Sequence, residues 1–197
     1  MKPTEYFYTF RKKRRIVSKN MRREYFFRPK DQSRRTIMSE NLKAAEDTSD
    51  REIVGYRLLN APRELVWKAW TDPNHVVHWW GPNGFTNTIE SMDVRSGGVW
   101  KFVMHGPDGV DYPNRIAFIE VVKPEKLVYT HGSDETDHPG DFFVTVTFKD
   151  LGGKTELVMR SIFKTKEARD EVIEKYGALE GMNQTLSHLE EYLTKMA

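Results

Sequence analysis

The sequence contains no cysteine, and no apolar run approaches the eighteen or so residues that a membrane-spanning helix needs. Without thiols the chain cannot form disulfide bonds, thiolate metal sites or a cysteine nucleophile, which fits a reducing compartment. The first residues also lack the apolar stretch of a secretory signal. We therefore expect a soluble, cytoplasmic protein.

Recognisable catalytic and metal-binding motifs are missing as well. There is no glycine-rich phosphate loop, nucleophile elbow or zinc-protease motif, and nothing indicates a cofactor. His75 and His78 stand three residues apart without an evident third metal ligand, and the polar segment 131–138 lacks the spacing of a calcium loop. We expect no metal site, and we favour a binding protein over an enzyme.

The charge of the chain is divided unevenly. Of the 31 Lys and Arg residues, 13 lie in 1–38, together with only three of the 29 Asp and Glu residues. The remaining part therefore has a net charge of −8, although the whole chain carries +2. An acidic folded part argues against a nucleic-acid-binding surface there.

Residues 1–38 combine basic runs with aromatic clusters and show neither a helical nor a strand period. We expect a disordered extension or a misplaced start, because Met38 and the residues after it resemble an ordinary start. The alternatives are a nucleic-acid tail, a membrane-surface anchor and an organelle transit peptide. Residues 39–50 are predicted to be a polar lead-in, and residues 51–197 to form one domain.

Within 51–197 the hydrophobic periodicity changes from strand to helix, then to strands, and back to helix. Residues 51–59 are predicted to be a strand, followed by a helix that Asn60 caps and by a second, short helix that Asp72 caps before Pro73. Alternating residues between 99 and 163 predict an antiparallel meander of about six strands, with 126–130 as one of them. Helices grouped around an antiparallel sheet indicate an α+β fold.

The last thirty residues carry an apolar stripe that steps by three or four positions. We expect this stripe to face the core along a short helix and a longer terminal helix, separated near Gly177 and Gly181. Its members are Val172, Tyr176, Leu179, Met182, Leu186, Leu189, Leu193 and Met196.

Six short motifs occur in a familiar order. They are Thr71-Asp72-Pro73 leading to Trp79-Trp80-Gly81-Pro82, then 93–100, Asp108-Gly109, 124–129, 144–148 and 180–186. In this arrangement residues 51–197 resemble the family named after the C-terminal domain of the activator of heat shock protein 90 ATPase. That family belongs to the START-like superfamily, with polyketide cyclases and the major birch pollen allergen.

The resemblance implies a helix-grip fold, in which a curved antiparallel sheet of about six or seven strands wraps around a long C-terminal helix. It also implies an apolar cavity between sheet and helix. Eight side chains are candidates for lining that cavity, and ordinary core packing is the alternative for each of them: Trp79, Trp80, Phe85, Trp100, Phe102, Met104, Tyr129 and Met182.

Asp93 and Arg95 precede Gly97-Gly98, where we expect an ion pair that fixes the turn; the alternative is a polar contact to a ligand.

Three functions follow from these patterns. The first is binding of a hydrophobic or amphipathic small molecule, the second a chaperone-interaction module, and the third a cyclase-like enzyme on the same fold. The patterns leave the oligomeric state open.

Overall fold

The computed structural model describes residues 47–132 and 141–196. The basic segment 1–38, most of the lead-in 39–50 and residues 133–138 of the polar segment lie outside the described residues. Residues from Thr48 onward belong to one compact unit. None of the helices described is long and apolar enough to cross a membrane.

Seven antiparallel strands form one sheet in the order β1-β7-β6-β5-β4-β3-β2. Every second side chain of β7 is buried, and alternation of this kind produces one apolar face, as the sequence indicates. The strands are β1 (Glu52–Leu59), β2 (Thr86–Met92), β3 (Val99–His105), β4 (Asp111–Val122), β5 (Lys126–Gly132), β6 (Phe142–Asp150) and β7 (Thr155–Ile162).

Two short helices follow β1, as predicted: α3 (Arg63–Thr71) and α4 (Pro73–Val76). The Asp72 side chain caps α4 by accepting a hydrogen bond from the backbone N–H of Asn74. The predicted cap of α3 is wrong. Pro62, not Asn60, precedes the helix, and no side chain caps it.

The C-terminal region forms α5 (Lys166–Tyr176) and α6 (Ala178–Met196). Gly177 separates them in the left-handed conformation, whereas Gly181 lies inside α6 and interrupts nothing. The predicted apolar stripe is wrong at its beginning, because Tyr176 and Leu179 are 69% and 46% exposed. These two positions lie beside the helix break, which changes the direction of the stripe.

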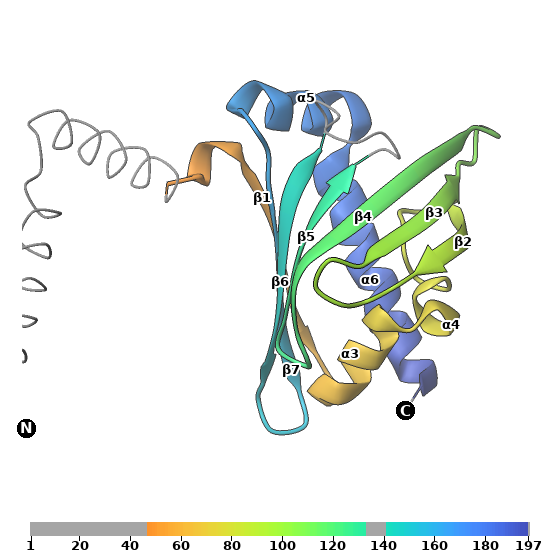
Figure 1. Ribbon diagram of the computed structural model, residues 1–197, viewed down its shortest axis with the longest axis vertical. Helices are drawn as coiled ribbons and strands as arrows, with labels where there is room; N and C mark the ends of the chain where they lie inside the picture. Colours follow the sequence, from red (N-terminus) through yellow and green to blue (C-terminus); the bar gives the residue numbers. More distant parts are fainter. Residues whose placement is uncertain (1–46, 133–140, 197) are drawn as a thin grey trace, which may run out of the picture. The chain divides into compact units, whose positions relative to one another are not determined.

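The sheet curves around α6, with α3 and α4 near one end of that helix and α5 near the other (Figure 1). Gly55 allows α6 to approach β1 closely. A Cβ atom there would lie 2.7 Å from Leu186 Cδ1 and 2.8 Å from Met182 Sδ. The Arg57 guanidinium also joins the two elements by donating to the Asn183 carbonyl at 2.9 Å.

Candidate ligand cavity

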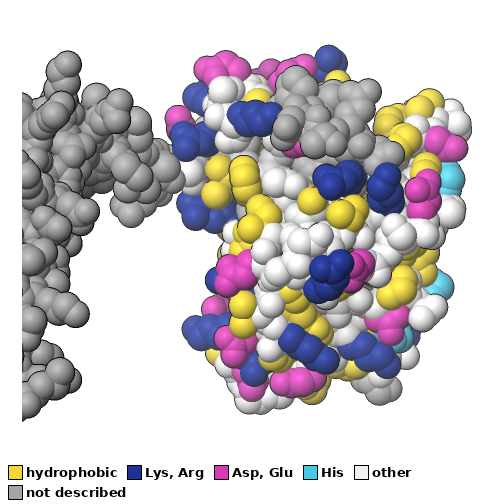
Figure 2. Space-filling model, viewed as in Figure 1, with side chains coloured by type: hydrophobic (Ala, Val, Ile, Leu, Met, Phe, Trp, Pro, Cys, Tyr) yellow, Lys and Arg dark blue, Asp and Glu magenta, His cyan; other side chains and the backbone are white. Residues whose placement is uncertain are grey.

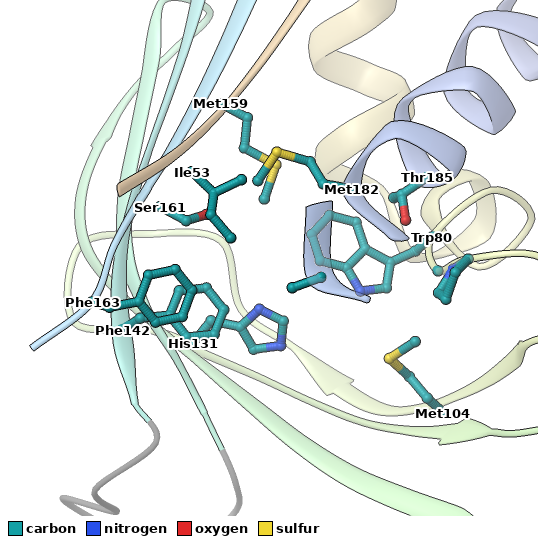
Figure 3. A pocket seen from close by; sticks show the side chains of 13 residues that line it. Ile53, Trp80, Met104, His131, Phe142, Met159, Ser161, Phe163, Met182 and Thr185 are labelled. Atoms are coloured by element: carbon teal, nitrogen blue, oxygen red, sulfur yellow. The ribbon is translucent and has the colours of Figure 1, made fainter. Parts of the chain in front are cut away.

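A cavity of about 170 Å³ lies between the sheet and the N-terminal half of α6 (Figure 3). Most of its lining is apolar, and the strands β1, β3, β5, β6 and β7 all contribute to it. The lining residues are Ile53, Trp80, Gly81, Pro82, Met104, His131, Phe142, Met159, Ser161, Phe163, Ala178, Met182 and Thr185.

The cavity follows from the residues that α6 presents along its length. From its middle onward, Leu186, Leu189 and Leu193 are buried and fill the core. In its N-terminal half, the small Ala178 and the flexible Met182 face the sheet instead. The space between helix and sheet is therefore filled at one end and hollow at the other.

Trp80 connects the aromatic core to the cavity. Its ring lies 5.5 Å from that of Trp79 and 5.1 Å from that of Trp100, with edge-on or tilted geometry. Its other side faces the cavity, where the Trp80 and His131 rings are 6.2 Å apart (Figure 3). Because Trp80 is only 5% exposed and core aromatic rings pack against it, it is a rigid part of the wall.

Three polar side chains interrupt the apolar lining: His131, Ser161 and Thr185. The Thr185 hydroxyl donates to the Gly181 carbonyl at 2.8 Å, so it is already paired. Ser161 Oγ and His131 Nδ1 are buried and have no hydrogen-bond partner among the described residues. Burial lowers the pKa of His131 from its ordinary 6.5 to about 4, so the imidazole is neutral at neutral pH.

Three of the eight proposed lining residues, Trp80, Met104 and Met182, come together at the cavity. The other five pack elsewhere. Trp79, Trp100, Phe102 and Tyr129 are buried in the core, and the Phe85 ring lies against Tyr112, 5.9 Å away.

His131 and Ser161 were missed as lining residues. The sequence predicts a strand that ends at residue 130 and places His131 in the polar segment that follows. In the structure β5 continues to Gly132, so His131 shares the inner face with Tyr129 two residues earlier. That alternation is the signal in the sequence that could have placed it.

Asp93 and Arg95 lie outside the cavity lining and form an ion pair, with Arg95 Nε 2.8 Å from Asp93 Oδ2. Both side chains are more than half exposed, so the pair adds little stability by itself. The turn also depends on Gly98. A Cβ atom at that position would lie 2.1 Å from the Asp93 carbonyl oxygen.

Two histidines, His75 in α4 and His78 just after it, contact Tyr192 of α6. His75 Nδ1 lies 3.0 Å from the Tyr192 hydroxyl, and the His78 ring stacks on the Tyr192 ring at 5.6 Å. In the described part of the chain, no group of three or more His, Cys, Asp or Glu residues could hold a metal ion. These contacts tie α4 to α6.

A second polar constellation joins the strands β2, β3 and β4. Thr88 Oγ1 lies 2.8 Å from His105 Nε2, and His105 Nδ1 lies 2.6 Å from Asp111 Oδ1. This is the bonding order of a nucleophile, a base and an acid. The His105 and Asp111 side chains are 37% and 66% exposed and lie outside the cavity lining, so we assign the constellation a structural role.

The comparisons with known proteins agree with this architecture. The family model described as "Activator of Hsp90 ATPase homolog 1-like protein" matches residues 60–194. The chain belongs to this family. No curated protein matches it at a significant level.

Several solved structures resemble this family member. A protein from Arthrobacter aurescens is 25% identical, with a TM-score of 0.70 over 76% of this chain and 89% of that one. A protein from Rhodobacter sphaeroides is 27% identical, with a TM-score of 0.66 over 75% and 95%. An AHSA1-like protein from Aeromonas hydrophila is 20% identical, with a TM-score of 0.59 over 74% and 93%, which shows the shared fold alone.

Proposed function

We propose that this protein binds a small apolar or amphipathic molecule in the cavity between the sheet and α6. The observation that carries the proposal is a largely apolar space of about 170 Å³ with a few inward polar groups. An apolar protein cavity of roughly 150 Å³ is large enough to bind benzene. The volume therefore suits a molecule of one ring, or one end of a longer molecule.

The apolar lining sets the expected affinity. Burying about 200 Å² of ligand surface contributes about 5 kcal/mol at about 25 cal/mol per Å², before the entropy cost of association. Since 5 kcal/mol corresponds to a dissociation constant of about 0.2 mM and the entropy cost weakens binding further, a one-ring probe should bind no more tightly than about 0.2 mM. A natural ligand with well-placed polar groups would bind more tightly.

Binding is favoured over catalysis by the chemistry of the lining. Among the described lining residues His131 is the one titratable group, and its pKa of about 4 makes it a weak general base at neutral pH. A cyclase-like reaction would require a stronger base or a second group that the ligand itself supplies.

A second candidate function is a protein-interaction module, as the family name suggests. Val54, Tyr56 and Leu58 project from the outer face of β1 and are 47%, 52% and 48% exposed. Figure 2 shows exposed hydrophobic side chains interspersed with charged ones on the face in view. Because these positions lie on an edge strand, a partner could contact them without entering the cavity.

Two neighbouring substitutions test the proposed cavity function. Ala178 lines the cavity, whereas Leu179 is exposed on the same turn of α6. We expect Ala178→Phe to weaken the binding of toluene and phenol at least tenfold, because the ring occupies the space. Leu179→Phe should leave binding unchanged.

The measurement is a titration of each probe followed by shifts of backbone amide resonances. In the unsubstituted protein the shifts should map to cavity residues such as Met182 and Ser161. If neither probe binds, or if both variants bind equally well, the proposed function is wrong.

A further inference from the structure

The hydrogen-bond network around His131 determines which ring nitrogen carries the proton. The Asn114 amide nitrogen donates to the Tyr112 carbonyl at 2.8 Å, which fixes the orientation of that amide. Asn114 Oδ1 consequently faces His131 Nε2, 3.1 Å away. An amide oxygen can only accept, so Nε2 carries the hydrogen, and Nδ1 is the nitrogen with the free lone pair.

The side chain that carries this free acceptor lines the cavity. His131 Nδ1 is buried and has no hydrogen-bond partner within the described ranges. The Phe142 and Trp80 rings flank the imidazole at 5.2 and 6.2 Å, and Figure 3 shows it projecting between them. A buried acceptor without a partner is costly, and such groups in native proteins generally have a partner.

The remaining lining restricts the charge of what can bind. It consists of apolar side chains, a paired Thr185 hydroxyl and Ser161, with no Lys, Arg, Asp or Glu among these residues. A carboxylate brought into this space would lose its hydration without gaining a cation. A neutral hydroxyl or N–H donor would lose much less and would pair with Nδ1.

We propose that the cavity selects a neutral molecule of ring size that carries a hydroxyl or N–H group and donates it to His131 Nδ1. This inference rests on the proposed function and specifies its ligand class. Ser161 Oγ, buried and unpaired in the described structure, is a second point at which a polar substituent can bind. It lies on β7, two strands from His131, so it would meet a different part of the ligand.

Phenol and toluene are matched probes, because they have the same number of heavy atoms and differ in the donor. A wholly apolar cavity prefers toluene, since phenol must give up its hydrogen bonds to water. With the acceptor present, we expect phenol to bind at least as tightly as toluene. Benzoate, which has no cationic partner in the lining, should bind at least tenfold more weakly than phenol.

His131→Leu removes the acceptor while nearly keeping the side-chain volume. We expect this variant to shift the preference by at least tenfold toward toluene, without weakening toluene binding. Thr185→Val is the matched control, because the Thr185 hydroxyl is also in the lining but already pairs with the Gly181 carbonyl. It should leave the phenol-to-toluene ratio unchanged.

The outcomes separate this inference from the proposed function. Binding of both probes with toluene preferred, or a ratio that His131→Leu does not change, would overturn the inference and leave the cavity function intact. Binding of neither probe would overturn both. Should His131→Leu not fold, the nitrogen resonances of His131 in the unsubstituted protein decide. Phenol must shift Nδ1, and toluene must not; equal shifts would overturn the inference.

Discussion

His131 links the cavity to the stability of the folded protein. Its pKa is about 4 in the folded state against its ordinary 6.5, because burial penalises the charged imidazolium. Between these two values the unfolded chain binds more protons than the folded one, so the free energy of unfolding decreases as the pH falls. The contribution of neutral His131 is complete above the unfolded pKa and is lost toward pH 4.

The size of this effect gives a prediction. Relative to neutral pH, His131 should lower the free energy of unfolding by about 2 kcal/mol at pH 5 and on the order of 3 kcal/mol below pH 4. Denaturant unfolding at several pH values measures it, with His131→Leu as the reference for all other titrating groups. If the protein and this variant lose the same stability between pH 7 and pH 5, the imidazole is not buried as described.

The sequence correctly predicts those cavity residues that belong to a regular strand or helix pattern. Met104 follows from strand alternation, and Met182 from helical spacing. Trp100 and Tyr129 share that inward face but lie deeper in the core, a difference that periodicity cannot express. The polar group of greatest interest, His131, was missed because the polar residues after it concealed the last two residues of β5.

The helix α6 has both fully buried and half-exposed leucines. Leu186 and Leu189 are 0% exposed, whereas Leu179 on the same helix is 46% exposed. We expect Leu186→Ala and Leu189→Ala each to lower the free energy of unfolding by about 2–5 kcal/mol. Leu179→Ala should change it by less than about 0.5 kcal/mol.

Chemical denaturation of the three variants provides the test. Equal, small effects at all three positions would mean that α6 does not close the core. A large effect at Leu179 would instead support the original expectation that the apolar stripe faces inward from its first turn.

The element that the sequence failed to indicate is β2. Its residues alternate weakly, and none of its side chains is fully buried, because it is an edge strand of the sheet. Backbone pairing with β3 holds it in place, and such pairing does not produce a periodic pattern of apolar residues in the sequence. By contrast, β3 lies inside the sheet and begins at Val99, where the predicted alternation of strands also begins.

The compact unit extends slightly beyond the predicted start of the domain at residue 51. Thr48 is only 4% exposed. Its hydroxyl donates to Glu52 Oε2 at 3.0 Å and accepts from Arg160 Nη2 at 2.6 Å. Arg169 of α5 also donates to the Asp50 carbonyl at 2.7 Å. Residues 48–50 therefore connect the start of β1 to β7 and α5.

Two truncated chains follow from these contacts. A chain that begins at Met38 keeps them all, and we expect its melting temperature to stay within a few degrees of that of the full chain, because the removed segment has high charge and no period. A chain that begins at Arg51 loses the contacts of Thr48 and Asp50. With about 1 kcal/mol for each hydrogen bond lost, its free energy of unfolding should fall by about 2–3 kcal/mol and its melting temperature by roughly 5–10 °C.

Thr48→Ala in the chain that begins at Met38 distinguishes the contribution of the Thr48 hydroxyl from that of the Asp50 backbone carbonyl. It should reproduce about two thirds of the loss, since it removes the two hydroxyl bonds to Glu52 and Arg160 but keeps the bond to the Asp50 carbonyl. Thermal unfolding followed by circular dichroism measures all three chains against the full one. A large fall for the chain that begins at Met38 would show that the basic segment contributes to the fold. Equal melting temperatures for the two truncated chains would instead restore residue 51 as the start of the domain.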